Sequence, residues 1–332
     1  MPLRLIESIV PAASLSVFDD IPDNGKFVDR WDEMLNNDKA LVRILVDASD
    51  VEKLLDGLVA RFENVDGFRV MLLPVEATLP RPVQLEPTEV NEQVEKSPER
   101  ISREEIYNLV SEGANISNVF IAQVVIATLV AAVGLTRGDT AILIGAMVIA
   151  PLLGPNMAMC LATTLGDWDL IRKSVKANLV GLVIALLCAV SIGLLFPVSV
   201  AQEAIAARTH VSGGDIILAL ASGCAGVLAF TTGAPAALIG VMVAVALLPP
   251  TAVLGMLLAG GEYHSATGAM MLVATNIICV NLAGTLTFLA QGLRPGSRWE
   301  AERAKRAIRI AVAIWSLMLV VLGVLIYFEM GK

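Results

Sequence analysis

Seven long apolar stretches follow one another along the second two-thirds of the chain. They cover residues 119–136, 141–165, 175–198, 215–232, 236–260, 268–293 and 310–328. Each approaches the roughly 20 apolar residues that a helix needs to cross the hydrocarbon core of a bilayer. The pattern therefore predicts seven transmembrane helices.

The first part of the chain has a different pattern, in which short strand-like stretches surround a helix. The strand-like stretches are residues 3–10, 26–31, 40–46 and 67–75, and residues 50–62 place Leu54, Leu55, Leu58 and Phe62 on one helical face. This order predicts a small cytoplasmic α+β domain of the ferredoxin-like, βαββαβ type over residues 1–80. Within it, residues 11–21 are expected to form a short first helix or an irregular connection. Because a fold alone does not assign function, a regulatory or oligomerising role and a plain structural role both stay open.

A polar segment separates these two parts. Residues 81–100 are rich in Pro, Glu and other polar residues and lack apolar periodicity, so we expect a linker there. Residues 101–114 then have amphipathic helical spacing, with Ser102 and Glu105 placed as in a capping box. We expect this juxtamembrane helix to rest at the membrane surface or to pack on the membrane domain.

Composition supports an integral membrane protein. The 332 residues are 56% hydrophobic and 17% charged, with a mean hydropathy of +0.72. The net charge of −8 hides an uneven division, because residues 1–113 hold 12 Lys/Arg and 23 Asp/Glu (net −11) and the remainder holds 12 and 9 (net +3). An acidic front domain does not favour nucleic acid, which is bound through clustered Lys and Arg.

The basic residues between the apolar stretches predict the orientation. With the N-terminus in the cytoplasm, nine Lys and Arg lie on the inside and two, Arg137 and Arg208, on the outside. The opposite orientation would invert the positive-inside rule. Residues 1–10 lack the apolar core of a secretory leader. We therefore expect a multi-pass protein of a bacterial-type inner (plasma) membrane, with a cytoplasmic N-terminus and the C-terminus outside.

Two of the apolar stretches contain the same interruption. The stretch IGAMVIAPLLGPNM begins at Ile144, and IGVMVAVALLPPTA begins 95 positions later at Ile239. The two copies lie in the second and fifth stretches, an odd offset of three spans that reverses their direction across the membrane. Residues 115–293 are therefore predicted to form a 3+3 inverted repeat, followed by a basic cytoplasmic loop and the seventh span over residues 294–332. A second echo pairs Asn178-Leu-Val-Gly181 with Asn281-Leu-Ala-Gly284 at an offset of 103.

Paired broken helices in inverted repeats point to a transport site, because the half-helix ends present dipoles and free backbone groups to a solute. Proline inside a helix also removes a donor and clashes with the preceding turn. The candidate pathway residues are Pro151, Gly154, Pro155, Asn156, Pro249, Pro250, Thr251, Asn178, Asn276 and Asn281. Asn178, Asn276 and Asn281, which lie outside the breaks, could equally serve to hold helices together through hydrogen bonds.

The sequence offers little other chemistry. No charged residue lies deep in an apolar stretch, which does not favour a proton- or sodium-coupled pump, and no motif of paired titratable groups indicates an enzyme. His210 and His264 are expected to be structural, although a metal or pH-sensing role is an alternative. Packing explains the four cysteines, and it explains the methionines near the breaks better than copper(I) does. We therefore expect no metal and no cofactor.

The interrupted stretches resemble a known family. The residues Gly145, Ala146, Met147, Ile149, Pro151, Leu152, Gly154 and Pro155, with the later Pro249-Pro250, are similar to the hydrophobic multispanning family catalogued as domain of unknown function 389. The resemblance covers about residues 115–292, and the segment ALVRILV with FRVMLLPVEATLP is similar to the N-terminal domain that many members carry. It implies a fold and no substrate.

Two hypotheses follow for the function. The first is a transporter or channel for a small ion or solute, with a midplane site at the two breaks and a cytoplasmic domain that regulates or assembles it. The second is a membrane-anchored sensor or scaffold whose cytoplasmic domain binds a ligand or partner. The expected partners are the lipid bilayer, a small ion or solute and further copies of the chain in a homo-oligomer, and no nucleic acid.

Overall fold

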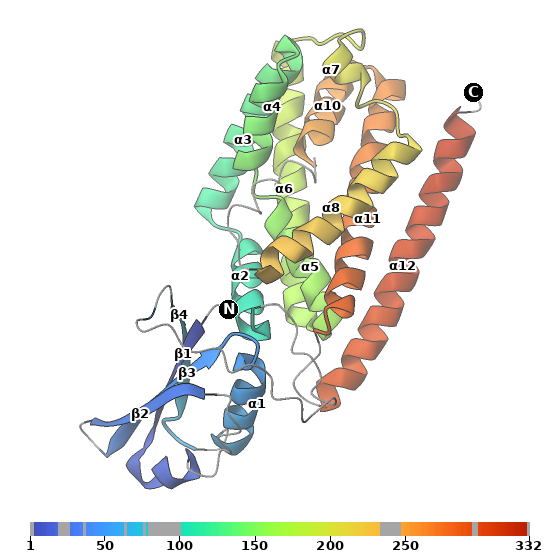
Figure 1. Ribbon diagram of the computed structural model, residues 1–332. Coiled ribbons are helices and arrows are strands. Elements are labelled where there is room, and N and C mark those ends of the chain that lie inside the picture. Colours follow the sequence, from blue (N-terminus) through green and yellow to red (C-terminus); the bar gives the residue numbers. More distant parts are fainter. Residues whose placement is uncertain are drawn as a thin grey trace. The chain divides into compact units, whose positions relative to one another are not determined.

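The computed structural model describes residues 3–18, 27–35, 38–62, 65–75, 78, 101–232, 247–293 and 298–330. The chain divides into two compact units, Met1–Glu104 and Glu105–Lys332. The first holds the strands and the second is helical (Figure 1). The predicted linker over residues 81–100 lies outside the described residues.

The first unit is built on a four-stranded antiparallel sheet. The strands are β1 Leu3–Pro11, β2 Phe27–Leu35, β3 Lys39–Asp47 and β4 Arg69–Val75, in the spatial order β2-β3-β1-β4. Between β1 and β2 lies a 3-10 helix, η1 Ala12–Phe18, and between β3 and β4 lies helix α1 Val51–Phe62. The predicted strands and helix are confirmed, and a 3-10 helix takes the place of the expected first helix.

The core of this unit lies between the sheet and α1. The buried side chains of β1 and β3 alternate along each strand, as period-two geometry requires, and α1 contributes Leu54, Leu55, Leu58 and Phe62. Phe62 stacks between Phe18, at 4.9 Å, and Phe68, at 5.0 Å between ring centroids. The predicted apolar face of the helix is therefore its core face.

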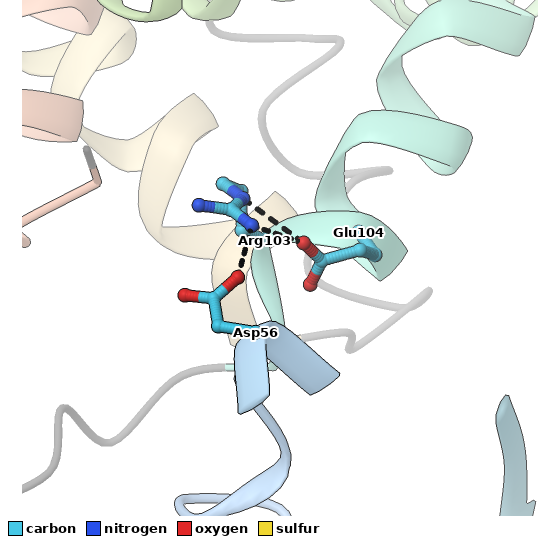
Figure 2. Close-up of polar contacts among 3 residues, drawn as sticks. All are labelled: Asp56, Arg103 and Glu104. Atoms are coloured by element: carbon cyan, nitrogen blue, oxygen red, sulfur yellow. Dashed lines mark hydrogen bonds and ion pairs between the residues drawn. The ribbon is translucent and has the colours of Figure 1, made fainter. Parts of the chain in front are cut away.

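Arg103, near the end of the first unit, is held by two carboxylates. Its Nη2 lies 2.8 Å from Oδ1 of Asp56 on α1 and 2.6 Å from Oε1 of Glu104, as Figure 2 shows. Burial by itself lowers the pKa of Arg103, but the carboxylates of Glu104 and Asp56 outweigh it and raise the pKa. The guanidinium is therefore charged, and it ties residues 103 and 104 to α1 within the first unit.

The second unit consists of helices. Its helices are α2 Arg103–Gly113, α3 Asn118–Arg137, α4 Thr140–Ile149, α5 Leu153–Leu165, α6 Trp168–Leu195, α7 Glu203–Ala206, α8 Gly213–Thr232, α10 Leu248–Ala259, α11 Tyr263–Ala290 and α12 Arg298–Met330. Five helices among the described residues are long and apolar enough to cross a membrane, or six if α4 and α5 form one span. This is a membrane-embedded protein. The first part of the predicted span 236–260 lies outside the described residues, and α10 covers its second part.

Glycine–aspartate pairs connect consecutive helices in two places. Gly138 ends α3 with a φ of 66°, and Gly166 ends α5 with a φ of 72°, a conformation that glycine adopts without steric cost. The next residue in each case caps the following helix, because Asp139 accepts from the backbone N–H groups of α4 and Asp167 from those of α6. Asp139 and Asp167 are therefore N-caps, each of the helix that follows it.

The helix bounds recur at a constant offset. Helices α3 and α8 both have 20 residues and start at 118 and 213, and α6 and α11 both have 28 residues and start at 168 and 263. Helices α5 and α10 start at 153 and 248. Each pair of starts differs by 95. Packing corresponds as well, because α3 packs on α6 as α8 packs on α11, and α5 packs on α11 as α10 packs on α6.

The first break lies at Pro151, between α4 and α5. Ala150 is extended, with a ψ of 122°, because the following Pro151 disfavours a helical conformation at the residue before it. Helices α4 and α5 consequently meet at a bend of 50°.

The other prolines do not interrupt helix interiors. Pro155 lies in the first turn of α5, and Pro249 and Pro250 lie in the first turn of α10. Backbone N–H groups in a first turn have no intrahelical acceptor, so proline there removes no hydrogen bond. Pro155, Pro249 and Pro250 are therefore residues of helix starts, and they cost their helices no hydrogen bond.

Helix α2 packs on the helical unit, as one of the two expectations for it stated. A Cβ at Gly113 would lie 2.9 Å from Cα of Gly154, so the two backbones touch beside the first break. The hydroxyl of Tyr107 donates to Oδ2 of Asp167 at 2.7 Å. Burial and this hydrogen bond raise the pKa of Tyr107 to about 12.

Candidate functional site

Three asparagines from three helices form a hydrogen-bonded chain immediately after the first break. Nδ2 of Asn156 on α5 donates to Oδ1 of Asn178 on α6 at 2.9 Å and to the carbonyl of Leu152 at 2.8 Å. Oδ1 of Asn156 accepts from Nδ2 of Asn281 on α11 at 2.9 Å. The bond from Asn156 to Leu152 supplies a partner for a carbonyl at the break itself. We call Asn156, Asn178 and Asn281 the amide chain.

Glycines bring the three helices close enough for these contacts. A Cβ at Gly181 would lie 2.8 Å from Cδ2 of Leu152, and a Cβ at Gly284 would lie 2.7 Å from Sγ of Cys160. Each glycine is one helical turn from an asparagine of the amide chain, since Gly181 follows Asn178 and Gly284 follows Asn281 by three residues. Close approach at the glycine therefore positions the amide beside it.

Two members of the amide chain are fully enclosed by protein and Asn178 is half-buried, and the site retains unused hydrogen-bonding capacity. Asn156 and Asn281 are 0% exposed. Nδ2 of Asn178 and Oγ1 of Thr285 are buried and have no hydrogen-bond partner of good geometry, and the polar neighbour of Thr285 is the weakly bonding thiol of Cys160. Thr285 follows Asn281 by one helical turn and is itself 0% exposed. A buried polar atom without a partner costs on the order of 1–3 kcal/mol, so two of them beside one network are unusual and suggest a group to be bound.

Cys160 also belongs to this site, although the sequence alone indicated a packing role. Its thiol lies 3.5 Å from Oδ1 and 3.6 Å from the backbone carbonyl of Asn281. Neither Cys160 nor Thr285 was among the predicted site residues. The one sequence signal that could have found Cys160 is its spacing of four residues from Asn156, which places both on the same face of α5.

The second break differs from the first. Oγ1 of Thr251 donates to the carbonyl of Leu247 at 2.8 Å, so Thr251 is bonded within its own helix, and it is 1% exposed. Pro249 and Pro250 are buried beside it. Both α5 and α10 pack between α6 and α11. The two breaks therefore share neighbouring helices, while the amide chain is built on the first break.

The remaining predicted residues lie around this centre. Pro151 and Gly154 flank the start of α5. Asn276 is buried on α11, but five residues correspond to about 140° around a helix, so it lies on a different face from Asn281. The repeated motif Asn178-Leu-Val-Gly181 and Asn281-Leu-Ala-Gly284 does not occupy equivalent positions in its two helices. Asn178 lies 10 residues after the start of α6 and Asn281 lies 18 residues after the start of α11, so the echo departs from the offset of 95.

The amide chain is electrically neutral. The polar groups at and beside it are amides, the Cys160 thiol and the Thr285 hydroxyl, and the aspartates of the neighbouring segments are at helix starts. Within the described parts of the chain, no group of three His, Cys, Asp or Glu side chains could hold a metal ion. This arrangement can exchange hydrogen bonds with a dehydrated solute, and it carries no group suited to proton transfer.

The sequence of the chain is similar to that of a known protein family. The family model described as domain of unknown function (DUF389) matches residues 147–282, which include both breaks. An uncharacterized protein of Methanocaldococcus jannaschii is 33% identical over 335 residues, covering 99% of this chain and 100% of that protein. No solved structure matches.

Proposed function

We propose that this chain, which belongs to the family described as domain of unknown function (DUF389), is a transporter or channel for a small ion or solute. The observation that carries the proposal is the amide chain at the first break, with the unpartnered Nδ2 of Asn178 and hydroxyl of Thr285 beside it. Buried polar groups in a membrane protein are costly, and they mark substrate and ion pathways as well as contacts between helices. The solute would form hydrogen bonds with these two groups when the site opens.

The recurrence of helix bounds supports a 3+3 inverted repeat. In such folds the interrupted helices of the two halves lie at a common solute site, and transport moves one half against the other. Helices α3 to α6 would form the first half and α8 to α11 the second, and α12 would be the last of the seven predicted spans. The conformation described has its site covered by protein, which is the state expected between openings to the two sides.

The orientation proposed for this transporter follows the positive-inside rule. The N-terminal unit lies in the cytoplasm and the end of α12 lies outside, in the plasma membrane. The antiparallel order β2-β3-β1-β4 is that of a ferredoxin-like domain, and we propose that this domain regulates the helical unit or assembles it into a homo-oligomer. Helix α2 is suited to transmit such an effect, because Gly113 touches Gly154 directly after the first break.

Solute flux into liposomes that hold the purified chain tests the proposal. The panel comprises small anions, small cations and neutral solutes, and the decisive variant is Thr285→Val. This substitution keeps the side-chain shape and removes a hydroxyl whose polar neighbour is only the weakly bonding Cys160 thiol, so the fold should be retained while flux falls. Thr287→Val is the matched control, because the Thr287 hydroxyl is already bonded to the carbonyl of Ala283. Equal flux in both variants, or no flux for any solute in the unmodified chain, would refute the proposal.

A sensor or scaffold is the second candidate, and one observation favours it. Asn156 and Thr251 are almost fully enclosed, and each has its hydrogen bonds satisfied within the protein. The amide chain would then only hold α5, α6 and α11 together, and the cytoplasmic domain would carry the activity by binding a ligand or partner. Absence of flux together with an unchanged fold on removal of the Thr285 hydroxyl is the result that this second function predicts.

A further inference from the structure

A cavity of about 280 Å³ lies where α8 and α11 begin, away from the amide chain. Its lining includes both histidines of the chain, His210 and His264, together with Met271. His210 comes from the segment between α7 and α8, and the other two come from α11. Residues 54 positions apart in the sequence are thus brought to one cavity whose lining offers two imidazoles and a thioether.

One face of α11 provides most of this arrangement. His264, Gly268 and Met271 are spaced by four and three residues, so they lie on the same side of the helix. A Cβ at Gly268 would overlap the backbone carbonyl oxygen of Thr209. Only glycine therefore allows the segment that carries His210 to lie directly on α11, between the histidine and the methionine of that helix.

The segment that carries His210 is fixed on both sides. Oγ1 of Thr209 donates to the carbonyl of Ala206 at 2.8 Å. The backbone N–H and the hydroxyl of Ser212 both donate to Oδ2 of Asp215, at 2.8 and 2.7 Å. These bonds hold His210 at the cavity without using its imidazole. Oδ2 of Asp215 is thereby engaged as well.

The donor set selects one class of ligand. Imidazole nitrogens suit copper, zinc, iron and nickel, whereas a thioether selects copper(I). A closed zinc site needs more nitrogen, thiolate or carboxylate ligands than this cavity has, and over the described ranges no three His, Cys, Asp or Glu side chains are grouped for a metal. Both imidazoles are exposed to solvent and therefore accessible to an incoming ion.

We propose that His210, His264 and Met271 form a binding site for a soft monovalent metal ion, copper(I), in this cavity. Gly268 is a positioning residue, because it lets the His210 segment reach α11. The site is separate from the amide chain and does not depend on the proposed transport function. In the orientation proposed above, the site faces the outside of the membrane.

Competition with bicinchoninate under reducing conditions tests this site on the purified full chain, carrying an affinity tag without histidine. Because free cysteines could also bind copper(I), each variant is compared with the unmodified chain in the same cysteine background. In His264→Ala and in Met271→Leu, we expect the affinity for one equivalent of copper(I) to be lower by about tenfold or more than in the unmodified chain. X-ray absorption of the copper-loaded chain should contain both nitrogen and sulfur neighbours, and the sulfur contribution should fall in Met271→Leu.

Met270→Leu is the matched control. Met270 is adjacent on the same helix but 52% exposed and outside the cavity lining, so this variant should bind as the unmodified chain does. Gly268→Ala leaves all three donors in place and should weaken binding by displacing the His210 segment. Equal binding by the Met271 and Met270 variants, or zinc(II) bound more tightly than copper(I), would overturn the proposal. If Met271→Leu does not fold, His210→Ala replaces it as the test, because His210 is exposed and its loss should weaken copper(I) binding without unfolding the protein.

Discussion

Oδ1 of Asn156 accepts a hydrogen bond from Nδ2 of Asn281 at 2.9 Å, across 125 positions of the sequence. This bond joins α5, the helix that follows the first break, to α11. With Asn178 on the opposite side of Asn156, it links three helices at one buried point.

Breaking this link should reveal a measurable coupling between the two asparagines. In a double-mutant cycle of Asn156→Leu and Asn281→Leu, each single change leaves a buried amide without its partner, so each should destabilise the protein by about 1–3 kcal/mol. The double variant should lose less than the sum, with a coupling of about 0.5–2 kcal/mol. Unfolding in mixed micelles measures these free energies. Strictly additive losses would show that the bond contributes nothing.

The contact of Gly113 with Gly154 should tolerate no side chain. In Gly113→Ala the new Cβ would meet backbone atoms, which cannot rotate away, and we expect a loss of about 1–3 kcal/mol. Gly145→Ala on α4 is the control, because nothing lies within 4 Å of a Cβ there. It should be neutral or stabilising by about 0.5–1 kcal/mol, owing to the better helix propensity of alanine. Thermal unfolding in detergent compares the two, and equal midpoints would contradict the close contact.

The Tyr107–Asp167 hydrogen bond should produce a stability change in alkali. Burial and the hydrogen bond to Asp167 raise the pKa of Tyr107 from 10.0 to about 12. A raised pKa means that the folded protein holds the proton more tightly, so this stabilisation is fully present below pH 10 and is lost as the pH rises through about 12. The unfolding midpoint of the unmodified chain should fall over this interval relative to that of Tyr107→Phe. Tyrosinate absorbance, taken as the difference between the two proteins, should titrate near the raised value and not near the ordinary one.

Phe62 should dominate the core of the front unit. It is 1% exposed and stacks on two rings, so Phe62→Ala should cost about 3–5 kcal/mol. Val59→Ala, on the exposed side of the same helix, should change stability by less than about 0.5 kcal/mol. Hydrogen exchange of peptides from β1, β3 and β4 in the full chain reports the loss. Unchanged protection in the Phe62 variant would be incompatible with this core.

Local signals in the sequence located most of the elements. Pro151 forces Ala150 out of the helical conformation, so the first break was predictable from the chain alone. Asp139 and Asp167 follow glycines that end helices, and each caps the next helix. The apolar face of α1 likewise identified the core of the front unit. All of these depend on residues only a few positions apart, whose interactions are fixed before any packing.

Only the tertiary structure decided which polar residues meet. The membrane helices are apolar on nearly all sides, so their sequences do not reveal which face packs inward, and the 95-residue recurrence gives no partner for Asn178 or Asn281. Their meeting on Asn156 depends on how closely Gly181 and Gly284 let α6 and α11 approach α5. In the same way, Gly268 beneath the carbonyl of Thr209 brings His210 to His264 and Met271. The sequence determined where the helices begin, break and end, and close packing between distant helices determined the two sites.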